Sequence, residues 1–142
     1  MFLLDTNVVS ELRKVRAGKA DPGVAAWADE TDAATQYISA ITILELELGV
    51  LRIERRDPPQ GRMLRTWMDH HVLPAFAGRV LPVDAAVARR CARLHVPEPR
   101  SERDALIAAT ALVHGMTVVT RNLDDLASTG AALLNPWRAP SR

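Results

Sequence analysis

The sequence predicts an α/β domain, a three-layer α/β/α sandwich with a mainly parallel sheet of four to five strands and a helical hairpin. Short apolar runs alternate with longer segments of helical periodicity along the 142 residues. Strands separated by helices pair in parallel, and helices then cover both faces of the sheet. The length suits one domain with a substantial core, so we expect a single domain over residues 1–142.

The expected strands are short apolar runs bounded by turn signals or by the start of a helix. The first, Phe2 to Leu4, ends in an acid and leads directly into an amphipathic segment, which is the pattern of a buried strand turning into a helix. The remaining strands are expected at Tyr37 to Ser39, Arg79 to Pro82, Met116 to Thr120 and Ala131 to Leu134.

The expected helices begin at capping or polar residues and end at glycine or proline. The first follows Asp5 directly, and the hairpin occupies about residues 41–76. Asp57-Pro58-Pro59 separates the two helices of the hairpin, and Gly115 ends the last long helix. The helices after the first are expected at Val24 to Asp32, Thr42 to Arg56, Arg62 to Phe76, Asp84 to His95 and Ser101 to Gly115, with a turn or short helix over Asn122 to Ser128.

Composition excludes several classes of protein. No stretch approaches the roughly 18 apolar residues that a membrane span needs, and the apolar run before Asp5 is too short for an export signal. Cys91 is the only cysteine, which excludes an intrachain disulfide and a cysteine-based metal cage. We therefore expect a cytoplasmic protein with no membrane contact. The net charge of +1 gives no argument for nucleic-acid binding from bulk electrostatics.

Asp5 is the first candidate functional residue, because it follows the first strand directly. In open α/β sheets ligands bind at the carboxyl edge of the strands, where loops and helix N-termini converge. An aspartate before a helix also serves as an N-cap that accepts a backbone N–H. The position of Asp5 alone leaves both roles open.

Two further acids present the same ambiguity. Glu45 lies on a narrow polar stripe of a helix that is otherwise apolar and is expected to be buried on most sides. Thr42-x-x-Glu45 also has the spacing of a capping box. Asp104 falls in the first turn of a later helix, above the small side chains of Ala108 and Ala111, and Ser101 gives it a similar capping alternative.

Independent capping would not explain why three acids converge on one edge of a sheet. Asp5 ends a strand, and Glu45 and Asp104 begin helices that meet the same edge. Close carboxylates raise one another's pKa unless a cation neutralises them. The economical interpretation is a divalent metal site whose ligands are all oxygens, which favours Mg²⁺ or Mn²⁺.

With these residues in place, the chain resembles the PIN-domain nucleases, and specifically the VapC-like ribonuclease toxins of type II bacterial toxin–antitoxin pairs. The resemblance covers essentially the whole chain and depends on four segments in the same order. They are Leu4-Asp5-Thr6-Asn7-Val8, Ile41-Thr42-x-x-Glu45-Leu46-x-x-Gly49, Asp104-x-x-Ile107-Ala108-Ala109-x-Ala111, and Thr117-x-x-Thr120-Arg121-Asn122-x-x-Asp125 followed by Leu134-Asn135-Pro136-Trp137.

The resemblance implies that Asp5, Glu45 and Asp104 are catalytic and bind the metal, directly or through water. In this family a fourth acid directly follows a Thr-Arg pair. The corresponding pair here is Thr120-Arg121, and the residue that follows it is Asn122. An amide carries no charge, so we expect Asn122 to be a weak ligand at most. Asp125 either replaces the missing acid through a water or caps the short turn.

The implied activity is metal-assisted hydrolysis of RNA phosphodiester bonds, so the chain is expected to be an Mg²⁺- or Mn²⁺-dependent endoribonuclease. Thr6, Asn7 and Thr120 would be hydrogen-bond partners of the metal ligands. A catalytically silent relative that binds RNA or protein is the main alternative. A phosphoacceptor domain is disfavoured, because it needs an acid beside Asp5 and a lysine near the phosphoryl group.

The resemblance also implies a homodimer and a cognate antitoxin whose C-terminal segment wraps the toxin and blocks the site. The hairpin between Ile41 and Phe76 is the expected surface, with Met63, Trp67 and Met68 available for contact. Ordinary core packing of these apolar side chains is the alternative.

Overall fold

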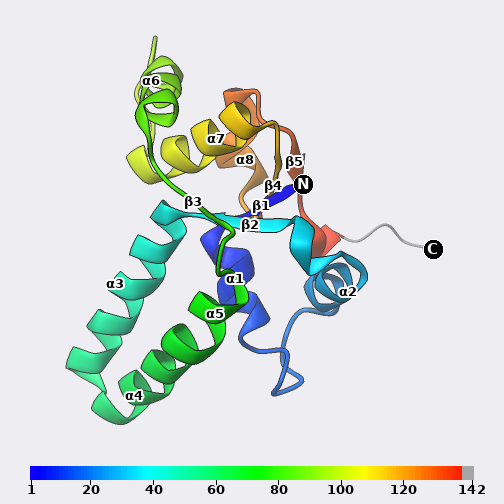
Figure 1. The fold of residues 1–142 in the computed structure, drawn as a ribbon, viewed down its shortest axis with the longest axis vertical. Coiled ribbons are helices and arrows are strands. Elements are labelled where there is room, and N and C mark those ends of the chain that lie inside the picture. The colour runs from blue at the N-terminus through cyan, green and yellow to red at the C-terminus, as the bar shows by residue number, and fades with distance from the viewer. Residues whose placement is uncertain (139–142) are drawn as a thin grey trace.

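The computed structural model describes residues 1–138, so the last four residues of the expected domain lie outside the described part. A five-stranded parallel sheet with the order β3-β2-β1-β4-β5 forms its centre (Figure 1). In register, Leu3 of β1 pairs with Tyr37 of β2 on one side and Val118 of β4 on the other. The strands are β1 (Phe2–Leu4), β2 (Gln36–Ser39), β3 (Val80–Leu81), β4 (Thr117–Val119) and β5 (Leu133–Leu134). The predicted fold class and all five predicted strands are confirmed.

Successive side chains of the strands point to opposite faces of the sheet and pack into two separate cores. Leu4 and Val119 pack on one face with residues of α1 (Thr6–Leu12), α2 (Pro22–Glu30) and α3 (Ala40–Arg56). Leu3 and Val118 pack on the opposite face with α7 (Glu102–His114) and α8 (Leu123–Leu126). Figure 1 accordingly shows α1 and α2 on one side of the sheet and α7 and α8 on the other. This arrangement is the predicted three-layer sandwich.

The hairpin consists of α3 and a second, composite helix. That second helix comprises α4 (Pro58–Trp67), a π-helical turn (Met68–Val72) and α5 (Leu73–Ala75). It starts at Pro58 and not at Arg62 as predicted, because Asp57 caps it by accepting the Gln60 N–H at 3.3 Å and proline is well suited to the first turn of a helix. Asp57-Pro58-Pro59 thus ends one helix and starts the next.

Helix α3 is less buried than its composition predicted. Leu44 and Leu51 are 47% and 51% exposed, whereas Thr42 is fully buried. One face of α3 packs on the sheet and on α4, and Leu44 and Leu51 face outward. The predicted capping box is also wrong, because Ser39 caps the helix by accepting the Ile41 N–H at 3.0 Å and Thr42 lies inside it.

Helix α6 (Ala85–Leu94) packs on α7 and forms a small core of its own with Val87, Cys91, Ala105 and Ala109. After α8 the chain continues as a 3₁₀ turn (Ala127–Thr129), so the short helix predicted over this region is confirmed. Two further 3₁₀ turns span Ala33–Thr35 and Pro136–Arg138. Within residues 1–138, none of the helices combines the length and the apolar character needed to cross a bilayer.

Candidate active site

Asp5 lies at the carboxyl end of β1 and is only 5% exposed. One carboxylate oxygen, Oδ1, accepts the Thr6 N–H at 2.8 Å, and the other, Oδ2, accepts the Thr120 hydroxyl at 2.8 Å. Burial raises the pKa of Asp5, these two hydrogen bonds lower it, and the charges of Asp104 and Glu45 raise it again, with a net upward shift. Asp5 therefore caps α1 and also lies within reach of the charges of two other acids, so capping does not exclude the predicted ligand role.

Glu45 reaches the cluster from the second turn of α3. Its Oε1 accepts the Thr6 hydroxyl at 2.7 Å, while the backbone N–H of Thr6 holds Asp5. Thr6 thus joins two acids that are 40 positions apart in the sequence. On its other side, Glu45 Oε2 lies 3.8 Å from Nη1 of Arg103.

Asp104 lies in the first turn of α7 and is half-buried. Its pKa is raised by burial first, then by the negative charges of Asp125 and Glu45, and is lowered by a hydrogen bond from Ser101. Ser101 is the N-cap residue but its side chain makes no capping bond to the helix backbone, so the predicted capping box at this helix is wrong.

Asp125 lies near the other acids, because its negative charge raises the pKa of Asp104. It is the third residue of α8, so it does not serve as the N-cap of that helix. Asn122 is the N-cap residue, and its backbone N–H donates to the Thr120 hydroxyl at 3.0 Å. Both Asn122 and Asp125 are exposed, and their roles as ligands stay predictions.

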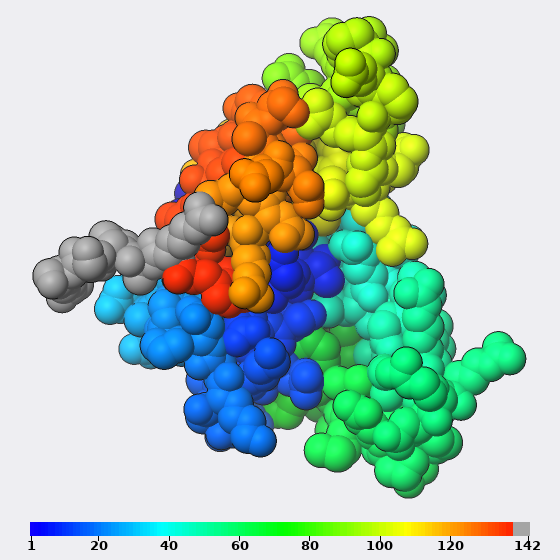
Figure 2. Space-filling model, turned by 180° about the vertical axis from the view of Figure 1, so that it is seen from behind, coloured from blue at the N-terminus to red at the C-terminus, as the bar shows by residue number. Residues whose placement is uncertain are grey.

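Thr120 and Asn7 complete the hydrogen bonds around Asp5. The Thr120 hydroxyl donates to Asp5, and Asn7 Nδ2 lies 3.4 Å from the same carboxylate. The Oδ1 of Asn7 in turn accepts the Arg121 N–H at 3.3 Å. Thr6, Asn7 and Thr120 therefore surround the Asp5 carboxylate with hydrogen-bond donors, and their role as partners of metal ligands stays a prediction. Figure 2 shows the face on which the N-terminal segment, α3, the start of α7 and α8 meet.

The carboxylates of these acids offer oxygen, the ligand type that suits a hard divalent cation. In the described part of the chain no three of them bring ligand atoms within 4.8 Å of one another, so the side chains would have to close on an ion. The pKa values of Asp5 and Asp104 are raised by burial first, and the negative charges of neighbouring acids add to the upward shift. Among the ion pairs within residues 1–138, only that of Arg103 with Glu45 brings a cation to one of these acids. Oxygen ligands with excess negative charge are what Mg²⁺ and Mn²⁺ prefer.

The raised pKa of Asp104 predicts a gain of stability when the charge is removed. A carboxyl whose pKa is higher in the folded state costs stability as the pH rises through its ordinary pKa, and the cost is complete at neutral pH. In EDTA at pH 7, Asp104→Asn should therefore raise the melting temperature by roughly 1–3 °C, a modest gain because solvent screens a half-buried charge.

Two features of the same thermal melts test this prediction. Below the ordinary pKa of aspartate the difference between variant and wild type should vanish, since both carry a neutral group there. Mn²⁺ should raise the melting temperature of the wild type more than that of the variant, because a ligand stabilises the state that binds it. A variant that melts below the wild type at pH 7 in EDTA contradicts the assignment.

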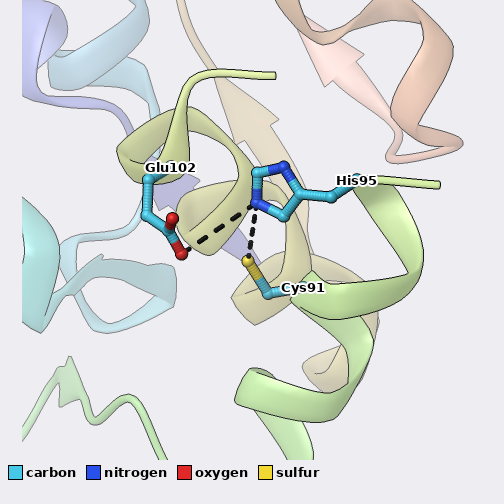
Figure 3. A group of neighbouring side chains, drawn as sticks. All are labelled: Cys91, His95 and Glu102. Atoms are coloured by element: carbon cyan, nitrogen blue, oxygen red, sulfur yellow. Dashed lines mark hydrogen bonds and ion pairs between the residues drawn. The ribbon is translucent and has the colours of Figure 1, made fainter. Parts of the chain in front are cut away.

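Cys91, His95 and Glu102 form a second polar group, where the end of α6 meets the start of α7 (Figure 3). His95 Nε2 lies 3.7 Å from Cys91 Sγ and 4.0 Å from Glu102 Oε1. Its Nδ1 accepts the Arg100 N–H at 3.2 Å, so the neutral ring carries its proton on Nε2. A metal would need the Nε2 lone pair, and we interpret this group as a polar joint at which the end of α6 contacts the start of α7.

The sequence reasoning did not identify this joint. Cys91 and His95 are four residues apart on one helix, a spacing that places two side chains on the same face and could have flagged the pair. Glu102 comes from the next helix, and no local pattern links it to them. Burial raises the pKa of the Cys91 thiol, with a contribution from the charge of Glu102.

The fold and the site define a class of protein: a parallel α/β protein with acids gathered at the carboxyl edge of its sheet. The PIN domain family matches residues 2–131, and the chain belongs to this family. It is 40% identical to "VapC ribonuclease Y4jK" of Sinorhizobium fredii over 96% of this chain and 98% of that protein. It is 38% identical to "Toxin FitB" of Neisseria gonorrhoeae over 96% and 99%.

A solved structure described as FitAB bound to an IR36 DNA fragment superposes with a TM-score of 0.88 at 35% identity, covering 100% of this chain and 99% of that one. The resemblance that the four sequence segments indicated is therefore confirmed across the chain.

Proposed function

We propose that this chain is a metal-dependent endoribonuclease that acts as the toxin of a toxin–antitoxin pair and uses Mg²⁺ or Mn²⁺. The observation that carries the proposal is the convergence of Asp5, Glu45, Asp104 and Asp125 on one edge of the sheet, with raised pKa values at Asp5 and Asp104. The names of the relatives, a VapC ribonuclease and a toxin, support RNA as the substrate. RNA and a free cysteine thiol both suit the cytoplasm.

In this proposal each side chain of the cluster has a distinct task. When bound, the metal ion polarises a phosphate oxygen and lowers the pKa of a coordinated water. Asp5 would hold it directly, since Thr6 and Thr120 fix the orientation of its carboxylate and leave lone pairs on both oxygens. Asp104 and Glu45 would ligate it directly or through water and orient the attacking water, and Asp125 would add the fourth negative charge.

The catalytically silent alternative depended on Asn122 at the fourth acidic position. The charge of Asp125 acts on Asp104, which supports Asp125 as the fourth acid in place of Asn122. We therefore favour the enzyme.

We also propose an antitoxin that binds along α1 and α4. A cavity of about 390 Å³ there is lined by apolar and basic side chains, including Arg13, Arg16, Met63 and Trp67. Met63 is 73% exposed and suits the partner interpretation, whereas Met68 is fully buried and belongs to the core. A C-terminal antitoxin segment with apolar and acidic side chains would complement this surface.

The homodimer remains a proposal as well. Leu44 and Leu51 lie seven residues apart on α3, so they share one face, and both are about half exposed. This apolar stripe would be covered by a second copy of the chain.

Cleavage of a mixed cellular RNA pool tests the proposed function. We expect discrete fragments with Mg²⁺ or Mn²⁺, no cleavage in excess EDTA, and recovery when metal is restored in excess. The protein must be folded and free of antitoxin, as shown by circular dichroism and intact mass. Cleavage that persists in EDTA would contradict the metal requirement, and the absence of cleavage in every metal would contradict the enzyme.

A further inference from the structure

Arg103 lies at the rim of the acid cluster. It is the second residue of α7 and directly precedes Asp104. Its Nη1 lies 3.8 Å from Glu45 Oε2, and its side chain is 46% exposed. Within residues 1–138 this is the ion pair that brings a guanidinium to one of the clustered acids.

Local physics does not favour an arginine at this position. The N-terminal turn of a helix carries partial positive charge, so a cation there is unfavourable and acids such as Glu102 and Asp104 are favourable. A long, exposed, single-contact ion pair contributes little stability in return. Residues that are unfavourable for their own helix and that add little stability elsewhere are expected at functional sites.

The chemistry of the guanidinium indicates its role. Arginine binds phosphate with a planar set of donors and stays charged at every relevant pH. With Glu45 engaged as a metal ligand, less of its charge would remain to hold Arg103. We propose that Arg103 then binds a phosphate of the RNA strand beside the scissile bond and positions the strand over the acids. This inference rests on the proposed function and names one residue that would hold its substrate.

The test compares Arg103→Gln with Arg56→Gln, which makes the same change of charge. Arg56 is in the last turn of α3, about 16 Å along the helix from Glu45 at 1.5 Å per residue. For a short fluorescent RNA with Mn²⁺, Arg103→Gln should raise KM by about tenfold to a hundredfold, the loss expected for a charged hydrogen bond, with kcat changed less than about threefold. Arg56→Gln should match the wild type, and Arg103→Lys should fall between.

Two further readouts do not require turnover. The Kd of the same RNA, measured by anisotropy with Ca²⁺ in place of Mn²⁺, should rise in parallel with KM. The slope of log Kd against the logarithm of the salt concentration should decrease by the amount expected for the loss of about one phosphate contact. Mn²⁺ binding without RNA, followed by electron paramagnetic resonance, should tighten by about two- to fivefold, because a competing cation has been removed from Glu45.

The outcomes separate this inference from the proposed function. If the wild type cleaves RNA and Arg103→Gln keeps its KM and Kd, the assignment of Arg103 is wrong while the nuclease stands. A lower melting temperature with unchanged RNA binding would identify a structural pair between α3 and α7 and also overturn it. If the wild type neither cleaves nor binds RNA, the proposed function fails and this inference fails with it.

Discussion

Replacement of Asp5 by asparagine is expected to lower the rate of metal-dependent RNA cleavage by roughly 10³-fold or more. Asp5 is the most buried of the four acids, and its charge would hold the metal directly. Loss of several kcal/mol of the stabilisation that the metal gives to the transition state corresponds to a rate change of this order. The measurement is the initial rate on a defined RNA at saturating Mn²⁺.

The structure also provides the control for this substitution. Asparagine caps helices as well as aspartate does, so the start of α1 should be retained and circular dichroism should be unchanged. Asp29→Asn makes the same chemical change at an exposed position of α2 and should leave the rate unaltered. A rate for Asp5→Asn above about a tenth of wild type would remove Asp5 from the centre of the site.

The largest loss of stability is expected at Gly61, where α3 and α4 pack most closely. A Cβ atom at this position would lie 2.4 Å from the Cα of Glu54 and 2.8 Å from its Cγ. Gly61→Ala should therefore force the two helices apart and destabilise the protein by about 2–3 kcal/mol, with a fall in melting temperature of roughly 5–10 °C. Urea unfolding followed by circular dichroism measures this loss.

Gly49→Ala is the matched control, with the opposite expected sign. Apart from the neighbouring backbone of α3 itself, no described atom lies within 4 Å of a Cβ at this position, so an added methyl group meets open space. Alanine in a helix interior stabilises by about 0.5–1 kcal/mol relative to glycine. Destabilisation by both substitutions would show that glycine matters here for reasons other than the close packing of α3 and α4.

Three of the four clustered acids could be predicted because each lies beside a recognisable strand or helix start. Asp5 follows an apolar run, and residues that directly follow parallel strands lie together at the carboxyl edge of the sheet. Asp125 was harder to assign, because its distance from the other acids depends on how the chain turns after Thr120. The pattern of apolar residues does not predict that turn.

The same kind of information was missing for predicting where α3 starts and which of its faces is buried. Ser39 and Thr42 both suit an N-cap, and the choice depends on β2 running straight into the helix at Ser39. Periodicity predicted that α3 is apolar on most sides but could not tell which of its apolar side chains the sheet and α4 would cover. Leu44 and Leu51 are exposed because burial depends on neighbours that are distant in sequence.

Thr6 bonds to Asp5 through its backbone N–H and to Glu45 through its hydroxyl, and this has a mechanical consequence. One residue sets the spacing between an acid that is fixed to the sheet and an acid that is carried by the hairpin. A displacement of α3 along its axis would therefore change the gap between the two carboxylates. A partner that binds the end of the hairpin far from Glu45 would then change the distance between the two carboxylates without contacting either of them.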